Sequence, residues 1–133
     1  MDGRIGALTE AEGQAVAEAC GAADVLVAVP ALNQARSVGH VVERVAAGLA
    51  KQRDLRLALA VLDAGSQDGT PAAVPGNTEW GLQPLVIPLP HARSRARAIL
   101  AALVGARRAS ARACVVVDAG LASVSPEGLE RLL

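Results

Sequence analysis

The chain has 133 residues, with 13 basic and 13 acidic side chains and therefore no formal net charge. Hydrophobic residues make up 52% of it, but Trp80 is its only Phe, Tyr or Trp residue. A protein that binds nucleic acid through phosphates needs clustered positive charge, and base stacking needs aromatic rings. The composition therefore excludes an electrostatic nucleic-acid binder and intrinsic disorder, and it predicts one globular domain with a core of small aliphatic side chains.

The cysteine content and the apolar runs restrict the class further. Cys20 and Cys114 are the only two cysteines, and no Cys/His cluster occurs. A disulfide-rich secreted domain and a zinc site are therefore excluded. No apolar run reaches the ~18 residues of a membrane span, and the first residues lack a signal-peptide pattern. We expect a cytoplasmic protein without a membrane span.

The first predicted element is a helix over residues 9–20. Thr9 and Glu12 have the spacing of a capping box, and Gly21 is a natural stop. Because this segment has little apolar bulk, we expect residues 1–23 to form an N-terminal helical arm that packs loosely. Residues 24–133 form the main domain in this prediction.

A strand–helix–strand unit opens the main domain. Residues 24–29 are a continuous apolar run bounded by Pro30, which is typical of a strand buried on both faces. Residues 55–62 form a second such run, which ends at Asp63. Between them, an amphipathic helix over 36–50 is predicted by apolar residues at helical spacing, namely Val38, Val41, Val42, Val45 and Leu49. The unit predicts two parallel strands joined by a right-handed crossover.

The alternation of strands and helices continues along the chain. Residues 63–70 predict a loop, Thr70 begins a helix of barely one turn, and residues 75–84 predict a surface loop. Residues 85–87 lie between two prolines, which predicts a short strand near a sheet edge.

Three further elements complete the prediction. A buried strand is expected over 113–117, directly before Asp118, and a helix is expected to start at Ser125. A helix over 92–106 is expected to carry the apolar residues Ile99, Leu100, Leu103 and Val104 on one side. The whole pattern predicts an α/β fold, with a three-layer, Rossmann-like, mostly parallel sheet flanked by helices.

Candidate functional residues follow from this topology. Ligands of open parallel sheets bind at the carboxyl ends of the strands, where Asp63 and Asp118 are expected. Asp68 lies in the same loop as Asp63, and it is either a ligand or a turn former. Three arginines precede or open the predicted helix over 92–106, namely Arg93, Arg95 and Arg97. They are candidate anion ligands, because the N-terminus of a helix favours anions. For each of them, a position on a solvated basic surface is the alternative interpretation. The dinucleotide fingerprint, the P-loop and the G-x-S-x-G elbow are all absent from the sequence.

Three segments resemble motifs of the family 2 glycosyltransferases. Residues 25–34 read VLVAVPALNQ and resemble the opening strand V-x-V-V-I-P-A-x-N-E of that family. Residues 62–70 read LDAGSQDGT and resemble V-D-D-G-S-x-D-G-T. Residues 115–120 read VVVDAG and resemble the strand that leads into the D-x-D motif. The order and approximate spacing match over about residues 24–133.

The resemblance implies a GT-A fold, of which the chain would be the nucleotide-sugar-binding portion, incomplete relative to a full domain. It implies a UDP- or GDP-linked sugar donor, with Arg93, Arg95 and Arg97 near the diphosphate. It also implies a Mg²⁺ or Mn²⁺ ion, for which Asp118 would be the ligand. The donor-nucleotide residues that it implies are Pro30, Asn33, Asp63, Ser66, Asp68 and Asp118.

The chain departs from the family at three acidic positions. Gln34 stands where the family has Glu, Ala64 where it has a second Asp, and Gly120 at the second acid of D-x-D. Glycine offers no side-chain oxygen to a hard cation, so the expected metal ligands are incomplete. The general base of the family lies beyond the D-x-D strand, and the sequence nominates no catalytic residue. Residues 118–127 also resemble a stretch of glucosyl- and mannosyl-phosphoglycerate synthases, which implies a phosphoglycerate-like acceptor.

Three functions stay open at this point. The first is a glycosyltransferase-like domain that binds a donor and transfers a hexosyl group when a C-terminal half completes it. The second is a catalytically inactive GT-A-like binding or scaffold module. The third is an unrelated doubly wound nucleotide-binding domain. An incomplete sheet exposes apolar surface, so we also expect a homodimer.

Overall fold

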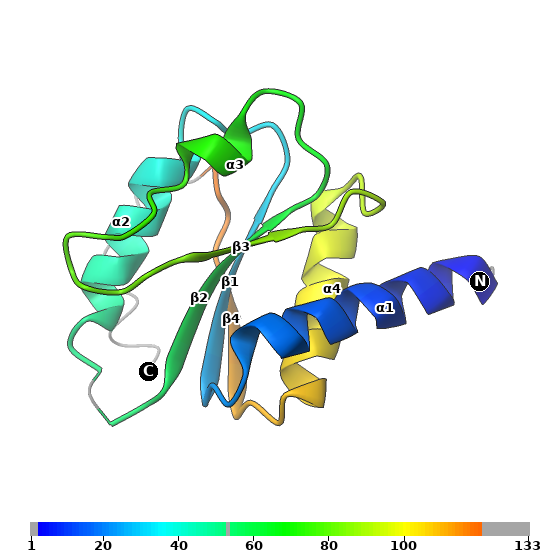
Figure 1. The fold of residues 1–133 in the computed structure, drawn as a ribbon, viewed down its shortest axis with the longest axis horizontal. Coiled ribbons are helices and arrows are strands. Elements are labelled where there is room, and N and C mark those ends of the chain that lie inside the picture. Colours follow the sequence, from blue (N-terminus) through cyan, green and yellow to red (C-terminus); the bar gives the residue numbers. More distant parts are fainter. Residues whose placement is uncertain (1–2, 53, 121–133) are drawn as a thin grey trace.

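The computed structural model describes residues 3–52 and 54–120 (Figure 1). In these residues the chain forms a parallel four-stranded sheet with the order β3-β2-β1-β4, flanked by helices on both faces. The predicted α/β fold class is confirmed, whereas the helix expected from Ser125 lies outside the described residues. The elements in chain order are α1 (Gly3–Cys20), β1 (Val25–Ala31), α2 (Val38–Leu49), β2 (Leu57–Asp63), α3 (Thr70–Ala73), β3 (Leu85–Pro88), α4 (Arg95–Arg108) and β4 (Ala113–Val116).

The two central strands supply both hydrophobic cores. β1 pairs with β2 over its whole length, from Val25 opposite Leu57 to Ala31 opposite Asp63. Alternate side chains point to opposite faces, so Val27 and Val29 pack under α2, whereas Leu26 and Leu62 pack under α1 and α4. The continuous apolar runs of the sequence therefore reflect strands that are covered on both faces.

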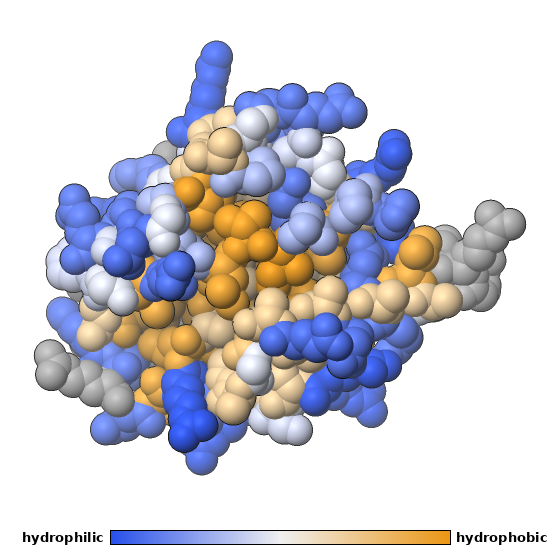
Figure 2. All heavy atoms as spheres, viewed as in Figure 1, coloured by the Kyte–Doolittle hydropathy of each residue, from blue (hydrophilic) through white to orange (hydrophobic). Residues whose placement is uncertain are grey.

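Most predicted elements are confirmed. The five apolar residues expected on one face of α2 are all buried, with at most 1% of each exposed. α3 is a single turn, and β3 lies at one edge of the sheet that the described residues form, where it pairs with β2. Figure 2 shows apolar surface at the centre of this view, where β3 runs in Figure 1, and Val86 of β3 is 39% exposed. No helix in the described ranges is both long and apolar enough to cross a bilayer.

The predicted apolar side of α4 is not the face that the helix buries. Leu100 and Leu103 are about half exposed, and the side that packs on the sheet consists of small residues, including Ala98, Ala101 and Ala102. The reason is the close approach of α1 to α4. A Cβ atom on Gly105 of α4 would lie 2.6 Å from the Cβ of Val16 in α1, so this contact accepts only the smallest side chains. The leucines consequently occupy the outer face.

The predictions for the N-terminal helix and for β4 also need correction. α1 begins at Gly3, not at Thr9, and Glu12 caps nothing, because its carboxylate accepts a hydrogen bond from Arg97 of α4 at 3.1 Å. Val16 is fully buried, so the helix is packed tightly and not loosely. β4 is partly exposed instead of buried, and among the described strands it pairs with β1 alone.

Candidate functional site

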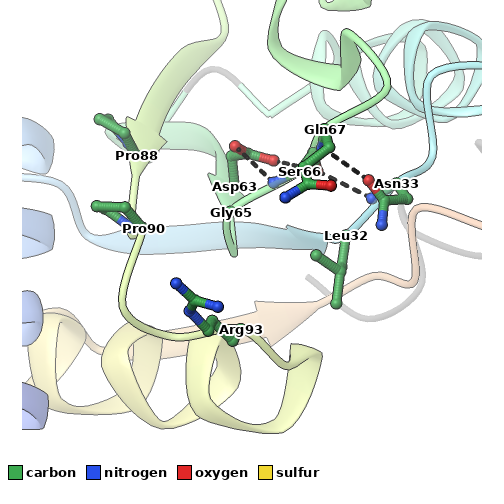
Figure 3. Close-up of a pocket in the computed structure, with 9 residues that line it drawn as sticks. All are labelled: Leu32, Asn33, Asp63, Gly65, Ser66, Gln67, Pro88, Pro90 and Arg93. Atoms are coloured by element: carbon green, nitrogen blue, oxygen red, sulfur yellow. Dashed lines mark hydrogen bonds between the residues drawn. The ribbon is translucent and has the colours of Figure 1, made fainter.

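The carboxyl ends of three neighbouring strands surround a cavity of about 570 Å³ (Figure 3). Its walls come from residues 32–33 after β1, residues 63–67 at the end of β2, and residues 88–93 after β3. In the described part of the chain, Asp63 and Arg93 are the charged residues that line it. A parallel sheet places loops of these three strands side by side at one edge, which is why residues so distant in sequence meet here.

Asp63 is anchored at the floor of this cavity. The residue is 6% exposed, and its carboxylate accepts hydrogen bonds from the hydroxyl of Ser66 and, at 3.4 Å, from the Ser66 backbone N–H. The Ser66 hydroxyl oxygen in turn accepts the backbone N–H of Asn33 at 2.9 Å. The carboxylate is thus held in one orientation, with lone pairs left over for further donors.

A set of side chains that we call the loop latch, namely Asn33, Ser66, Asp68 and Thr70, ties the loop after β1 to the loop after β2. Asn33 has a positive φ of 55°, which asparagine tolerates, and its side-chain oxygen accepts the backbone N–H of Gln67 at 2.8 Å. Thr70 is fully buried, and its hydroxyl oxygen accepts the backbone N–H of Gln34 at 2.8 Å. These hydrogen bonds therefore hold the two loops together.

Asp68 completes the latch. Its carboxylate accepts the hydroxyl and the backbone N–H of Thr70, and also the backbone N–H of Ala35 at 3.1 Å. The hydrogen bond from the Thr70 side chain, followed by that from Ala35, lowers the pKa of Asp68. Hydrogen bonds to the ionised form favour that form, so this carboxylate is a charged structural cap on the loop.

Arg93 is the cationic residue of the cavity. It lies in the turn before α4 with a positive φ of 56°, and its backbone N–H donates to the carbonyl oxygen of Ala64 at 2.9 Å. In Figure 3 its side chain extends toward the loop that carries Asp63 and Gly65. Within the described part of the chain, no ion pair or hydrogen bond occupies its guanidinium group. The group is available to an anion in the cavity.

A second cavity, of about 350 Å³, lies on the other side of β1. It is lined by Pro30, Arg95, Ile99, Val116 and Asp118. The carboxylate of Asp118 accepts from Arg95 Nη1 at 3.2 and 3.4 Å and from the backbone N–H of Gly120 at 2.8 Å. Asp63 and Asp118 thus share the carboxyl edge, as predicted, but they belong to separate cavities, since β1 lies between their strands.

Pro30 explains why the sheet opens at this point. Alternate residues of β1 direct their backbone groups toward β4, and Ala28 accepts the N–H of Val117 on that side. Pro30, two residues later, has no N–H to donate in the same direction. Pairing between β1 and β4 accordingly stops at Ala28 opposite Val116. The proline therefore ends the ladder where the second cavity begins.

The structure separates the predicted site residues into groups. Asn33, Asp63, Ser66 and Arg93 line the first cavity, and Pro30, Arg95 and Asp118 line the second. Asp68 serves the latch and lines neither. Arg97 also lies outside both cavities, because it donates to the carbonyl oxygen of His91 at 2.8 Å and to Glu12.

The contacts of Gln34, Gln67 and Thr70 between the two loops were not predicted from the sequence. A signal for them was present, because the polar pairs at 33–34 and 66–67 each follow one of two adjacent parallel strands. The cysteines have no such role. Burial raises the pKa of the Cys20 and Cys114 thiols, which makes both poor nucleophiles.

The expected Mg²⁺ or Mn²⁺ ion does not fit the residues at this edge. The described residues contain no group of three or more His, Cys, Asp or Glu side chains that could hold a metal ion. A Cβ atom on Gly120 would lie 2.8 Å from Nε2 of Gln34 and 3.3 Å from Oδ1 of Asp118. Two of the three positions that lack the family's acids, Gln34 and Gly120, therefore face each other beside Asp118, and both are neutral.

Comparison of the chain with models of known protein families, with curated proteins and with solved structures finds no significant match.

Proposed function

We propose that the chain binds a nucleoside diphosphate, as the nucleotide part of a nucleotide-diphospho-sugar donor, at the carboxyl edge of its sheet. The single observation that carries the proposal is the presence in one cavity of an anchored acceptor, Asp63, and of Arg93, a cation that pairs with no acid among the described residues. A nucleoside offers N–H and O–H donors, and a diphosphate offers negative charge. The cavity volume of about 570 Å³ lies within the range of small-ligand sites.

Each polar group has a distinct task in this proposal. The Asp63 carboxylate accepts hydrogen bonds from the base or the ribose, because it lines the cavity and has lone pairs that Ser66 does not use. The Arg93 guanidinium binds the diphosphate, for which its planar fork of donors is suited. Asn33 and Ser66 contribute through the loop latch, which fixes the walls before the ligand arrives and so reduces the entropy lost on binding.

Isothermal titration calorimetry with UDP and GDP tests the proposal. We expect saturable binding of at least one of them, and a loss of affinity of about tenfold or more in Asp63→Asn, since a hydrogen bond to a charged group contributes about 1.5–3 kcal/mol. Asp54→Asn is the matched control, because Asp54 is an exposed acid just before β2, at the opposite end of that strand. Thermal melts establish that both variants fold. The proposal fails if neither nucleotide binds at millimolar concentration, or if Asp63→Asn binds as the native protein does.

A second candidate, the inactive binding module, is favoured by a different observation. Transfer to a hydroxyl acceptor needs a general base. Within the described residues, the two acids that line the edge cavities are both already engaged, Asp63 by Ser66 and Asp118 by Arg95. Incubation with UDP-glucose or GDP-mannose distinguishes the candidates. Binding without release of UDP or GDP favours the module, whereas turnover that requires Asp63 favours a transferase.

A further inference from the structure

We infer that this site binds its nucleoside diphosphate without a divalent cation, and that Arg93 and Arg95 together supply the positive charge that a metal ion would provide. The inference rests on the proposed function, because it concerns how the same ligand is held.

The carboxylate at the second cavity is already bound by other groups of the protein. A Mg²⁺ or Mn²⁺ ion shared by the protein and a diphosphate needs oxygen ligands in an open geometry. Among the described residues, Asp118 is the acid that lines the second cavity, and Oδ1 of its carboxylate already accepts from Arg95 and from the Gly120 N–H. The neighbouring side chain is the amide of Gln34, whose nitrogen lies on the side of Gly120. A cation placed here would meet a guanidinium group instead of a second carboxylate.

The positions of the two arginines favour an anion at the end of β1. They flank the end of β1, with Arg93 in the cavity on the β2 side and Arg95 in the cavity on the β4 side. Both belong to the segment that leads into the first turn of α4, a helix of 14 residues whose N-terminal dipole adds to their attraction for an anion. In the inferred complex the diphosphate bridges the end of β1 and contacts both guanidinium groups.

Arg95 can exchange Asp118 for another anion at a low cost in free energy. Its ion pair with Asp118 is open to solvent, with side-chain exposures of 50% and 48%. Exposed ion pairs of this kind contribute little to stability, so a phosphate can displace the carboxylate from Arg95. Asp118 keeps its hydrogen bond from the Gly120 N–H when that happens. Arg95 thus exchanges one anionic partner for another, and no unpaired charge is left in a buried position.

Calorimetric titration of the whole chain with UDP and GDP, in EDTA and then in Mg²⁺ or Mn²⁺ at matched ionic strength, tests the inference. We expect the dissociation constant to agree within about twofold between the two conditions. We also expect Arg93→Gln and Arg95→Gln each to weaken binding in EDTA about tenfold, as for the loss of a charge-assisted hydrogen bond. Arg107→Gln is the matched control, because Arg107 is an exposed arginine in the last turn of the same helix.

The possible results separate this inference from the proposed function. Binding that needs Mg²⁺ or Mn²⁺ overturns the inference and leaves the proposed function standing. Metal-independent binding that both Arg93→Gln and Arg95→Gln retain at full affinity also overturns it. Absence of binding in both conditions overturns the proposed function, and the inference with it. Thermal melts of the three variants identify any loss of affinity that comes from unfolding.

Discussion

Thr70→Val removes a hydroxyl that connects two loops while keeping nearly the same side-chain volume. The hydroxyl oxygen accepts the backbone N–H of Gln34 at 2.8 Å, and its hydrogen bonds Asp68. Each hydrogen bond contributes about 1 kcal/mol net, and the Gln34 N–H loses a partner in a partly buried place. We therefore expect the free energy of unfolding to fall by about 2 kcal/mol.

Urea denaturation followed by far-UV circular dichroism measures this loss. With a slope of about 2 kcal/mol per M for a small protein, the midpoint should fall by about 1 M in Thr70→Val. Thr70→Ser is the control, because it keeps both hydrogen bonds and loses one methyl group, at a cost of about 1 kcal/mol. A midpoint for Thr70→Val equal to or above that of Thr70→Ser would refute the role given to the hydroxyl in the loop latch.

Three other changes have definite expected outcomes. Ala64→Asp would restore an acid of the family pattern, but Ala64 is fully buried beside Leu62. We therefore expect this variant to lose about 3 kcal/mol in free energy of unfolding or to fail to fold. Urea midpoints or soluble yield measure the loss, and a midpoint equal to that of the native protein would contradict the prediction. The depressed pKa of Asp68 means that its contribution to stability is present at neutral pH and is lost as the pH falls through its ordinary value of 3.8 toward the lower folded value. Asp68→Asn should therefore be less stable than the native protein at pH 7 and nearly equal to it at pH 2.5, and a gap that does not shrink with falling pH would argue against the latch. Gly105→Ala should lower the melting temperature because its Cβ would meet Val16, whereas Gly6→Ala, with nothing within 4 Å, should leave it unchanged or raise it.

The fold was predictable because its signals are local. The continuous apolar runs at β1 and β2 predict strands that are covered on both faces. The spacing of Val38, Val41 and Val45 predicts the buried face of α2. The face of α4 was not predictable from its own residues. Apolar bulk would normally turn Leu100 inward, but the contact between Gly105 and Val16 depends on a helix some 90 residues earlier in the chain.

The candidate site shows the same division between local and distant signals. The strand-end rule predicted the edge at which Asp63 and Asp118 lie, because that rule depends only on the order of elements. It could not predict that the two acids occupy different cavities, which follows from the strand order and from Pro30. It also could not assign Asp68 to the latch or Arg97 to Glu12, since those partners lie 33 and 85 residues away.

Titration of ¹⁵N-labelled protein with UDP and with GDP, followed by amide chemical shifts, tests the proposed nucleotide site between Asp63 and Arg93. We expect saturable shifts at Asn33, Ser66, Gln67 and Arg93, with none at Trp80, which lies by Leu57 at the opposite end of β2. Shifts confined to the Trp80 end, or no shifts at millimolar nucleotide, would contradict this proposal.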